Sequence, residues 1–420
     1  MSDRLVLRGG TVLTLAGRTP NLATGDVLID DGRIAEVGTA VVAPRDAEEI
    51  DCTDAIVMPG FVDTHRHTWT SLFRNAGEGL DAGSSVTALR EHHQPDDVYA
   101  ATLVGVLGAI EAGITTVVDH VDVAGGRAAI EAAAQAHADS GIRAVLVQPD
   151  PAPASPADGV AFASAVGSIA DVGSVADAWA AARASGMRIH AHAGDGTGGP
   201  GVVAALAQRG LLGSDVTLVH HTALDDADVR AIVDAGARVS LAPSAEMANG
   251  QGSPPIQELM DRDVRPGLGV DQERVAPGDM FAQMRQTISL QHATVFDRKL
   301  MGKGSLPKLM STRDVIRYAT VDGARVAGLG GLTGSIEPGL QADVIVLRTD
   351  RPNVWPVNDA IGAVVWGMDT SNLSHVIVGG RVVLRDGGLA TDVARARELA
   401  TGARERVVAA AGLAPAGAAR

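Results

Sequence analysis

Cysteine is almost absent from this chain of 420 residues, which contains only Cys52. A single cysteine excludes a disulfide within the chain and a zinc site built from several thiolates. Any metal ion must therefore be held by histidine and carboxylate side chains. Lysine is nearly as scarce, and the only lysines, at positions 299, 303 and 308, lie close together in the sequence.

Long apolar runs and an excess of positive charge are also missing. Without a run of about 18 apolar residues, the sequence predicts no membrane-spanning helix and no membrane partner. The N-terminus lacks the basic and then apolar pattern of a secretory signal, so a cytoplasmic location is expected. The formal net charge of −15 disfavours nucleic acid as a partner, because its binding depends on Lys and Arg that neutralise phosphates. We expect a small-molecule substrate instead, and a homo-oligomer.

The stretch 59–67, Pro-Gly-Phe-Val-Asp-Thr-His-Arg-His, follows the apolar run 55–58 and ends in two histidines one residue apart. Side chains at positions i and i+2 of a strand point to the same face, so His65 and His67 are expected to lie side by side. Neutral imidazole is the commonest metal ligand in proteins. The pair therefore predicts a metal site, with two packed or surface histidines as the alternative.

Three further apolar runs end in side chains that can bind a metal or move a proton. They are residues 188–192 with His190 and His192, residues 216–221 with His220 and His221, and residues 268–271 with Asp271. Each run follows a helix-like segment. Four such strand ends in order predict one shared site at the carboxyl ends of parallel strands.

The middle of the chain alternates helix and strand. Four predicted helices, each closed by a glycine and followed by a strand, cover residues 96–113, 128–140, 175–185 and 226–234. This repeat predicts an α/β fold, a (β/α)8 TIM-like barrel over residues 58–335. Residues 148–173 and 75–85 are expected to be loops, the first with a short helix over the barrel mouth. Residues 312–323 predict one helix.

Both ends of the chain predict short strands. Near the N-terminus, Gly9-Gly10 is expected to separate two strands, and Asp31-Gly32 to form a hairpin turn. Strands expected at 342–347 and 375–384 supply the partners that the N-terminal strands lack. The sequence thus predicts a discontinuous β-sandwich domain from residues 1–57 and 336–390, and then a C-terminal helix and tail at 391–420.

Several motifs together carry a resemblance to a known family. Besides the stretch 59–67, they are Ala-Gly-Ile-Thr-Thr-Val-Val-Asp (112–119), His192, His220, Gly-Leu-Gly-Val-Asp (267–271) and Gly-Ser-Ile-Glu-Pro-Gly-Leu-Gln-Ala-Asp-Val-Ile-Val-Leu (334–347). With these motifs the chain resembles the amidohydrolase superfamily, in particular its mononuclear branch of cytosine and guanine deaminases, S-adenosylhomocysteine deaminases and triazine chlorohydrolases. The resemblance spans nearly the whole chain and does not specify a substrate.

The resemblance implies a metal centre with an open position for water and four ligands: His65, His67, His192 and Asp271. Three imidazoles and a carboxylate suit one divalent ion, zinc first and iron as the alternative. His220 is implied as a proton donor or orienter, and Asp271 also as acceptor of the water proton. His190 remains an alternative ligand to His192, because both lie on one strand face. His221 alternates to the other face and is expected to pack in the core.

Two further expectations follow from comparison with the same superfamily. Its binuclear members bridge two metals through a lysine on the fourth strand, and the segment 142–147, which we expect to be that strand, has no lysine. We therefore expect one metal ion. Asp195 stands where the relatives carry a glutamate that shuttles protons, and it is about 1.5 Å shorter. Asp195 is either the shuttle or a solvated loop residue, in which case Asp271 and His220 carry the proton transfer.

Four residues are candidates for contacts with a substrate: Trp69, Arg74, His120 and Glu246. Trp69 can stack on a planar ring or simply pack at the barrel mouth, and Glu246 can bind an amino group or be a solvated charge. The predicted function is hydrolysis of a C–N bond, by deamination or amide hydrolysis, in a small polar heterocycle or cyclic amide through metal-activated water. Hydrolytic dechlorination or ring opening on the same site is one alternative, and a non-catalytic scaffold is another.

Overall fold

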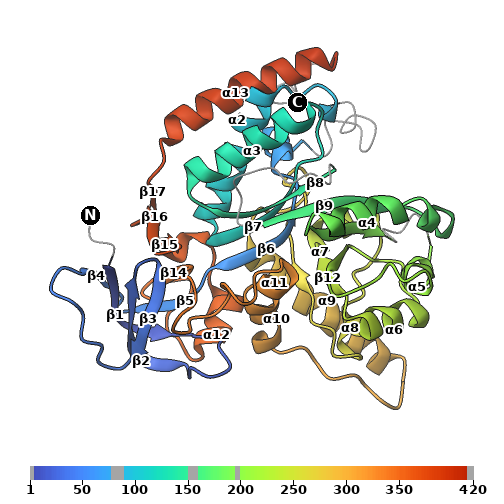
Figure 1. The fold of residues 1–420 in the computed structure, drawn as a ribbon. Helices are drawn as coiled ribbons and strands as arrows, with labels where there is room; N and C mark the ends of the chain where they lie inside the picture. The colour runs from blue at the N-terminus through green and yellow to red at the C-terminus, as the bar shows by residue number, and fades with distance from the viewer. Residues whose placement is uncertain (1–3, 77–88, 150–158, 194–198, 414–420) are drawn as a thin grey trace, which may run out of the picture.

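An eight-stranded parallel barrel forms the centre of the molecule (Figure 1). The computed structural model describes residues 4–76, 89–149, 159–193 and 199–413. Neighbouring barrel strands follow one another in chain order: β6 (Phe61–Arg66), β7 (Ile114–His120), β8 (Arg143–Gln148), β9 (Gly159–Val166), β10 (Arg188–Ala193), β11 (Val216–Val219), β12 (Arg238–Leu241) and β13 (Gly267–Leu268). The predicted (β/α)8 barrel is confirmed.

Helices follow the barrel strands and surround the barrel (Figure 1). They are α2 (Pro95–Glu111), α3 (Gly126–Ser140), α4 (Ala176–Ala184), α5 (Val202–Gln208), α6 (Asp226–Ala235), α7 (Pro243–Ala248), α8 (Ile256–Met260), α9 (Met280–Leu300), α10 (Thr312–Tyr318) and α11 (Val321–Val326). The four helices predicted from the sequence are present as α2, α3, α4 and α6. Gly113, Gly141 and Gly236 follow three of them with positive φ angles, a conformation that glycine adopts without a Cβ clash.

The barrel closes between β6 and β13 through the backbone of Asp271. The Asp271 amide donates to the His65 carbonyl at 2.8 Å, and the His67 amide donates to the Asp271 carbonyl at 2.9 Å. A Cβ atom on Gly269 would lie 2.8 Å from the His65 carbonyl oxygen, so this close approach requires glycine. The closure therefore brings Asp271 beside the two histidines of the first strand.

Strand β9 shows that the prediction of a loop over residues 148–173 is wrong. Residues 159–166 read Gly-Val-Ala-Phe-Ala-Ser-Ala-Val, and their backbone pairs in parallel with β8 and β10. A short 3-10 helix, η2 (Ile169–Gly173), follows the strand. The segment 142–147 is consequently the third barrel strand and not the fourth. The fourth strand, β9, contains no lysine either, so a single metal ion is still expected.

Strands from both ends of the chain form a second, mixed sheet beside the barrel (Figure 1). Its nine strands are β1 (Arg4–Val12), β2 (Leu22–Asp30), β3 (Arg33–Gly38), β4 (Glu48–Asp51), β5 (Ala55–Pro59), β14 (Val344–Arg348), β15 (Leu373–Val378), β16 (Arg381–Arg385) and β17 (Gly388–Leu389). Antiparallel pairing of β14 with β5 joins the two ends. The predicted small β domain from both termini is confirmed, whereas its exact residue bounds remain a prediction.

Three local predictions can be compared with the backbone. The Asp31-Gly32 turn between β2 and β3 is confirmed, and both of its residues have the positive φ that a two-residue hairpin favours. Gly9-Gly10 does not separate two strands, because β1 runs through it with shifts of register against β2 that the positive φ of Gly9 accommodates. Residues 312–323 form two helices, α10 and α11, because Thr320 between them is not helical.

The C-terminal helix α13 (Val393–Ala410) packs against α2 (Figure 1). Ala403 and Val407 of α13 share a buried cluster with Trp69 and Phe73 of the 3-10 helix η1 (Thr68–Phe73). This helix begins directly after His67. The packing of α13 therefore supports the segment that follows the two histidines.

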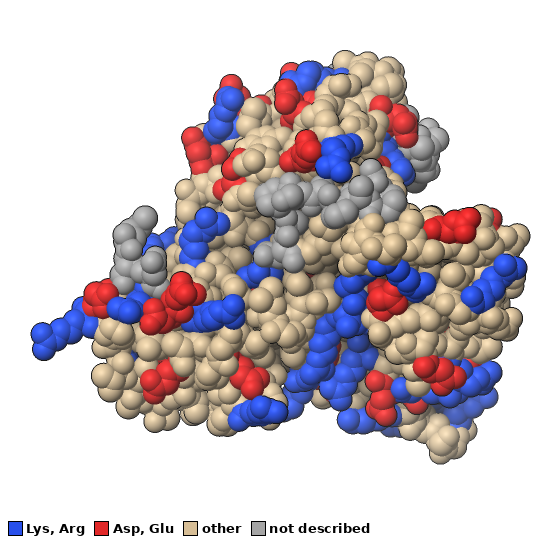
Figure 2. All heavy atoms as spheres, in the orientation of Figure 1, with Lys and Arg blue, Asp and Glu red and all other residues tan. Residues whose placement is uncertain are grey.

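None of the described helices is long and apolar enough to cross a membrane. Lys and Arg side chains gather in a band near the centre of the face drawn in Figure 2, and Asp and Glu are scattered around it. The net charge of −15 is therefore not gathered into one acidic patch on this face.

The ion pair between Arg143 and Asp343 joins the barrel to the second sheet. Arg143 Nε donates to Asp343 Oδ2 at 2.7 Å and Nη2 donates to Oδ1 at 3.1 Å, and both side chains are buried. Removing one partner leaves a buried charge uncompensated, so Asp343→Ala should lower the free energy of unfolding by about 3–5 kcal/mol. Unfolding by denaturant measures this loss of free energy. In the exposed Arg348–Asp350 pair, Asp350→Ala should change stability little, and equal losses in both variants would contradict the prediction.

Candidate metal centre

His65 and His67 lie at the carboxyl end of β6 with their side chains close together. Their ring centres are 4.9 Å apart. The Nε2 atom of each ring faces Asp271 Oδ1, at 3.3 Å from His65 and 3.5 Å from His67. All three side chains are buried. The first and last barrel strands thus direct three potential ligands to one point.

His192 from β10 and His120 from β7 bring two more imidazoles to this point. His192 Nε2 lies 3.4 Å from His65 Nε2, and the ring centre of His120 lies 4.3 Å from that of His65. One nitrogen from each of His65, His67, His120 and His192 lies within 4.8 Å of the others. His65, His220 and Asp271 form a second group, whose ligand atoms also lie within 4.8 Å of one another. We call the combined set the histidine cluster.

His220 follows β11 and is held by Glu246. Its Nε2 lies 3.9 Å from Asp271 Oδ2 and its Nδ1 lies 3.1 Å from Glu246 Oε1. Glu246 belongs to α7, whose first turn brings the carboxylate back to accept from the Ala242 amide at 2.8 Å. Burial alone lowers the pKa of His220, but the hydrogen bond to Glu246 and the charge of Asp271 outweigh it and raise the pKa. His220 is therefore suited to hold and donate a proton.

The donor atoms fit a divalent cation. Burial, and then repulsion from neighbouring histidines, lowers the pKa of His65 well below its usual value and that of His192 to about 3. Both rings are therefore neutral near pH 7 and offer a lone pair. Asp271 Oδ1 is buried and accepts no hydrogen bond among the described residues. Such an oxygen, facing imidazole nitrogens, is costly unless a cation or a proton satisfies it.

Asp122, which the sequence analysis did not single out, orients His67. Its Oδ1 lies 2.9 Å from His67 Nδ1 and accepts from Trp69 Nε1 at 2.7 Å. Burial lowers the pKa of His67, but Asp122 raises it to a net value of about 9, so a cation that binds at Nε2 must displace a proton. In the sequence, Asp122 could have been found from its position two residues after His120, which ends β7.

The amidohydrolase family model matches residues 56–383 of the chain. The chain belongs to the amidohydrolase family. Among its relatives, a 5-methylthioadenosine/S-adenosylhomocysteine deaminase of Symbiobacterium thermophilum is 27% identical, over 91% of this chain and 94% of the relative. A 5'-deoxyadenosine deaminase of Methanosarcina mazei is 26% identical, over 92% of this chain and 94% of the relative. This amidohydrolase thus belongs to a family of metal-dependent enzymes in which these two relatives are deaminases.

Solved structures share the fold of this amidohydrolase. A zinc-bound adenosine deaminase from Xanthomonas campestris superimposes with a TM-score of 0.80 and 21% identity, over 96% of this chain and 98% of that one. Atrazine chlorohydrolase from Arthrobacter aurescens TC1, complexed with zinc, has a TM-score of 0.77 and 20% identity, over 95% of this chain and all of that one. Both likenesses establish the architecture.

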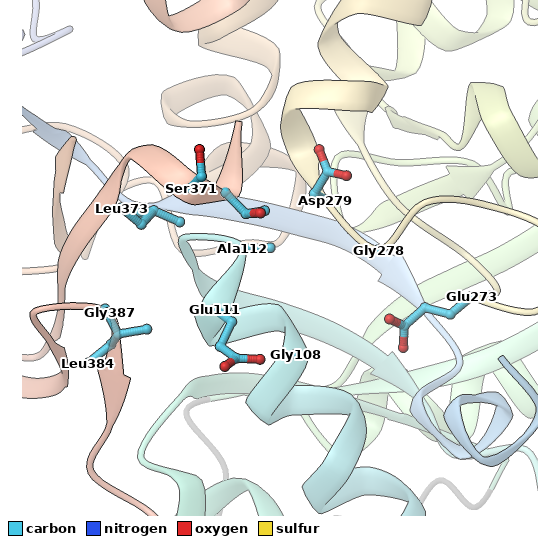
Figure 3. A pocket seen from close by; sticks show the side chains of 11 residues that line it. Gly108, Glu111, Ala112, Glu273, Gly278, Asp279, Ser371, Leu373, Leu384 and Gly387 are labelled. Carbon is cyan, nitrogen blue, oxygen red and sulfur yellow. The ribbon is translucent and has the colours of Figure 1, made fainter. Parts of the chain in front are cut away.

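The structure separates the four substrate-contact candidates. His120 and Glu246 lie in the histidine cluster or against it, and Trp69 is buried, with its indole bound to Asp122. Arg74 instead donates to both carboxylate oxygens of Glu273, at 3.0 and 2.9 Å. Glu273 lines a cavity of about 460 Å³ between α2, the start of α9 and the C-terminal strands (Figure 3). The lining of that cavity includes none of the predicted site residues, and the substrate roles remain predictions.

Three other residues were considered from the sequence: His190, His221 and Asp195. His190 is buried on β10, outside the two groups of potential metal ligands formed by described residues. His221 is buried beyond the end of β11, and its backbone, like that of His220, is left-handed, so the strand alternation predicted for these two histidines does not apply. Asp195 lies outside the described residues. Its role as a shuttle, and the choice of His192 over His190, remain predictions.

Replacing Asp122 by asparagine should weaken metal binding without removing it. The amide keeps the size of the side chain but loses the charge that faces His67 Nδ1. Loss of such an outer partner typically costs about 10–100-fold in metal affinity, which competition with a chelator measures. Asp139→Asn, at an exposed carboxylate of α3 that accepts from Tyr99, is the control. Unchanged affinity in Asp122→Asn would show that this contact does not tune the centre.

Proposed function

We propose that this amidohydrolase uses one divalent ion, zinc in the first instance, and water to cleave a C–N bond of a small polar heterocycle or cyclic amide. Deamination with release of ammonia is the reaction that we favour. The observation that carries the proposal is the histidine cluster, in which one group of ligand atoms comes from His65, His67, His120 and His192 and a second from His65, His220 and Asp271. A scaffold without chemistry has no need of buried imidazoles and a carboxylate that converge in this way.

Different residues of the chain carry out different steps of the proposed reaction. The imidazoles and Asp271 would hold the ion, which when bound would lower the pKa of a coordinated water to about 7. Asp271 Oδ2, which faces His220, takes the proton from the attacking water. The oxygen then bonds to the ring carbon, the C–N bond breaks, and the nitrogen leaves as ammonia after it receives a proton. His220 Nε2, 3.9 Å from Asp271 Oδ2, orients the water and supplies a proton on the substrate side.

Glu246 supports this role of His220. Its Oε1 is bound to His220 Nδ1 and the Ala242 amide, while its Oε2 is buried without a hydrogen-bond partner among the described residues. The carboxylate fixes the ring and stabilises its cationic form, as an orienting acid does for a catalytic histidine. The free Oε2 also suits an amino or ring N–H group of a substrate, in line with the prediction from the sequence.

Adenosine analogues are the first substrates to test. The two named relatives are deaminases of 5-methylthioadenosine, S-adenosylhomocysteine and 5'-deoxyadenosine, and each aligns with nearly the whole of this chain. We therefore propose a 6-aminopurine nucleoside as the leading substrate class. Pterins, cytosine derivatives, aminotriazines and cyclic amides complete the panel.

The test is ammonia release from this panel by zinc-loaded protein. We expect turnover of at least one compound, loss of that turnover after metal removal with a chelator, and recovery on addition of zinc. Chloride release from a chlorotriazine without ammonia release from any compound would favour the dechlorinase alternative. Zinc-loaded, folded protein that converts no member of the panel would contradict the proposal and favour a scaffold.

Asp195→Asn tests the proton shuttle. If Asp195 carries a proton from the water to the leaving nitrogen, the amide, which keeps the shape of the side chain but cannot accept a proton, should lower kcat and kcat/KM together by about 10² while metal content stays unchanged. Steady-state kinetics on the substrate found in the panel, with metal analysis, measure this. Asp225→Asn, at the N-cap of α6, is the control. Near-normal turnover in metal-loaded Asp195→Asn would leave proton transfer to Asp271 and His220.

A further inference from the structure

His120 is the member of the histidine cluster for which the proposed chemistry has no role. It ends β7, is buried, and its Nε2 has no hydrogen-bond partner among the described residues. A core histidine normally satisfies its nitrogens with protein or water. His190 is also buried without such partners, so a missing partner does not by itself distinguish the two. The distinction lies in where the nitrogen points, because only His120 belongs to a group of converging ligand atoms in the described structure.

The spacing of the four imidazole rings matches that expected around one metal ion. A zinc-bound imidazole nitrogen lies about 2.1 Å from the ion, so neighbouring imidazole ligands of one ion hold their ring centres roughly 5 Å apart, whether the ion has four ligands or more. The centres of His65, His67 and His192 are 4.9, 4.9 and 6.0 Å apart. Those between His120 and the same three rings are 4.3, 5.3 and 5.1 Å. His120 therefore completes the arrangement as closely as the three predicted ligands do.

We propose that His120 is a further ligand of the ion held by His65, His67 and His192. The inference rests on the proposed metal-dependent function and assigns to His120 a place at the metal in place of the substrate contact predicted from the sequence. With Asp271, the chain then offers five donors, four imidazoles and one carboxylate. A catalytic site keeps a position open for water, so the ion must take more than four ligands when water binds. Imidazole-rich sets suit zinc, copper, iron and nickel.

The first experiment compares metal affinity in two histidine-to-phenylalanine variants. His120→Phe keeps a ring of similar size and removes the donor nitrogen. His190→Phe makes the same change at a buried histidine whose ring centre is 5.8 Å from that of His120. Zinc affinity, measured by competition with a chelator, should fall more than about 100-fold in His120→Phe, beyond the usual cost of an outer partner, and less than tenfold in His190→Phe. Equal affinities in His120→Phe and the wild type would overturn the assignment.

A second readout is the visible absorption of cobalt-loaded protein, which reports the number and type of ligands without any substrate. We expect weak bands from a five- or six-coordinate ion in the wild type and in His190→Phe, and a shifted, stronger spectrum in His120→Asn. His120→Asn is included because the smaller, polar side chain keeps the variant folded if phenylalanine does not fit. A wild-type spectrum in His120→Asn together with a raised KM would make His120 a substrate contact and overturn the proposal.

The outcomes separate this inference from the proposed function. If wild-type protein binds no divalent ion, the metal-dependent hydrolase itself fails. If wild-type protein binds one ion with unchanged affinity and spectrum in both His120 variants, only the role of His120 fails.

Discussion

His65→Ala should leave the purified protein with far less than one divalent ion per chain and without measurable turnover. His65 is shared by both groups of potential ligands, and its Nε2 lies 3.3 Å from Asp271 Oδ1 and 3.4 Å from His192 Nε2. Its loss removes a ligand from the middle of the cluster, and the affinity should fall by more than the 10–100-fold typical of an outer partner. Metal analysis and turnover on the substrate found in the panel measure the two effects.

The controls for this prediction lie within the chain. Asp271→Ala should behave in the same way, because the carboxylate faces both His65 and His67. His292→Ala, on α9 with its ring bound to the Met310 carbonyl, should keep one ion per chain. Two tightly held ions per chain in wild-type protein would contradict the mononuclear centre that the missing lysine predicts.

The strand-end histidines were predictable because topology, more than local detail, brings them together. Carboxyl ends of parallel strands meet at one edge of a barrel, so side chains that end β6, β10 and β13 converge wherever the intervening helices run. What the sequence could not supply is the backbone at Asp271, whose φ of +62° directs the carboxylate inward. That conformation arises from hydrogen bonds across the barrel closure, between residues about two hundred positions apart.

Strand β9 was missed because its own residues carry little of the signal. It consists mostly of glycine, alanine and small polar residues and follows a segment rich in proline and alanine. Pairing with β8 on one side and β10 on the other makes it a strand, and such neighbours override local propensity in sheets. The (β/α)8 fold was predicted correctly despite this omission, since the helix, glycine and strand repeat elsewhere implied the missing unit.

Residues that position the ligands were harder to find than the ligands. Asp122 and Glu246 act through contacts with His67 and His220 that only the folded chain creates. A solvated charge and a buried orienting carboxylate look alike in sequence, and Glu246 was predicted only as a candidate for substrate binding. In the structure its side chain is fully buried beside His220, so Glu246 is not a solvated charge.

His220→Ala should keep the metal while turnover falls by about 10² to 10⁴, the usual scale for loss of an acid–base group. In the histidine cluster, His220 Nε2 stands 3.9 Å from Asp271 Oδ2, farther than the 3.3 and 3.5 Å that separate Asp271 Oδ1 from His65 and His67. The contact of His220 Nδ1 with Glu246, which raises the pKa of the ring, favours a role in proton transfer over a role as an anchor for the ion. kcat and kcat/KM should therefore fall together, with metal content near one per chain.

Glu246→Gln separates the chemistry of His220 from its support. Glutamine can still accept a hydrogen bond from His220 Nδ1 but carries no charge, so the ring stays in place while its cationic form loses stabilisation. Turnover should fall less than in His220→Ala, and the double variant should be no worse than His220→Ala alone, because both changes act through the same ring. Losses that multiply in the double variant would mean that Glu246 acts on the substrate independently. Loss of the metal in His220→Ala would instead make His220 a ligand.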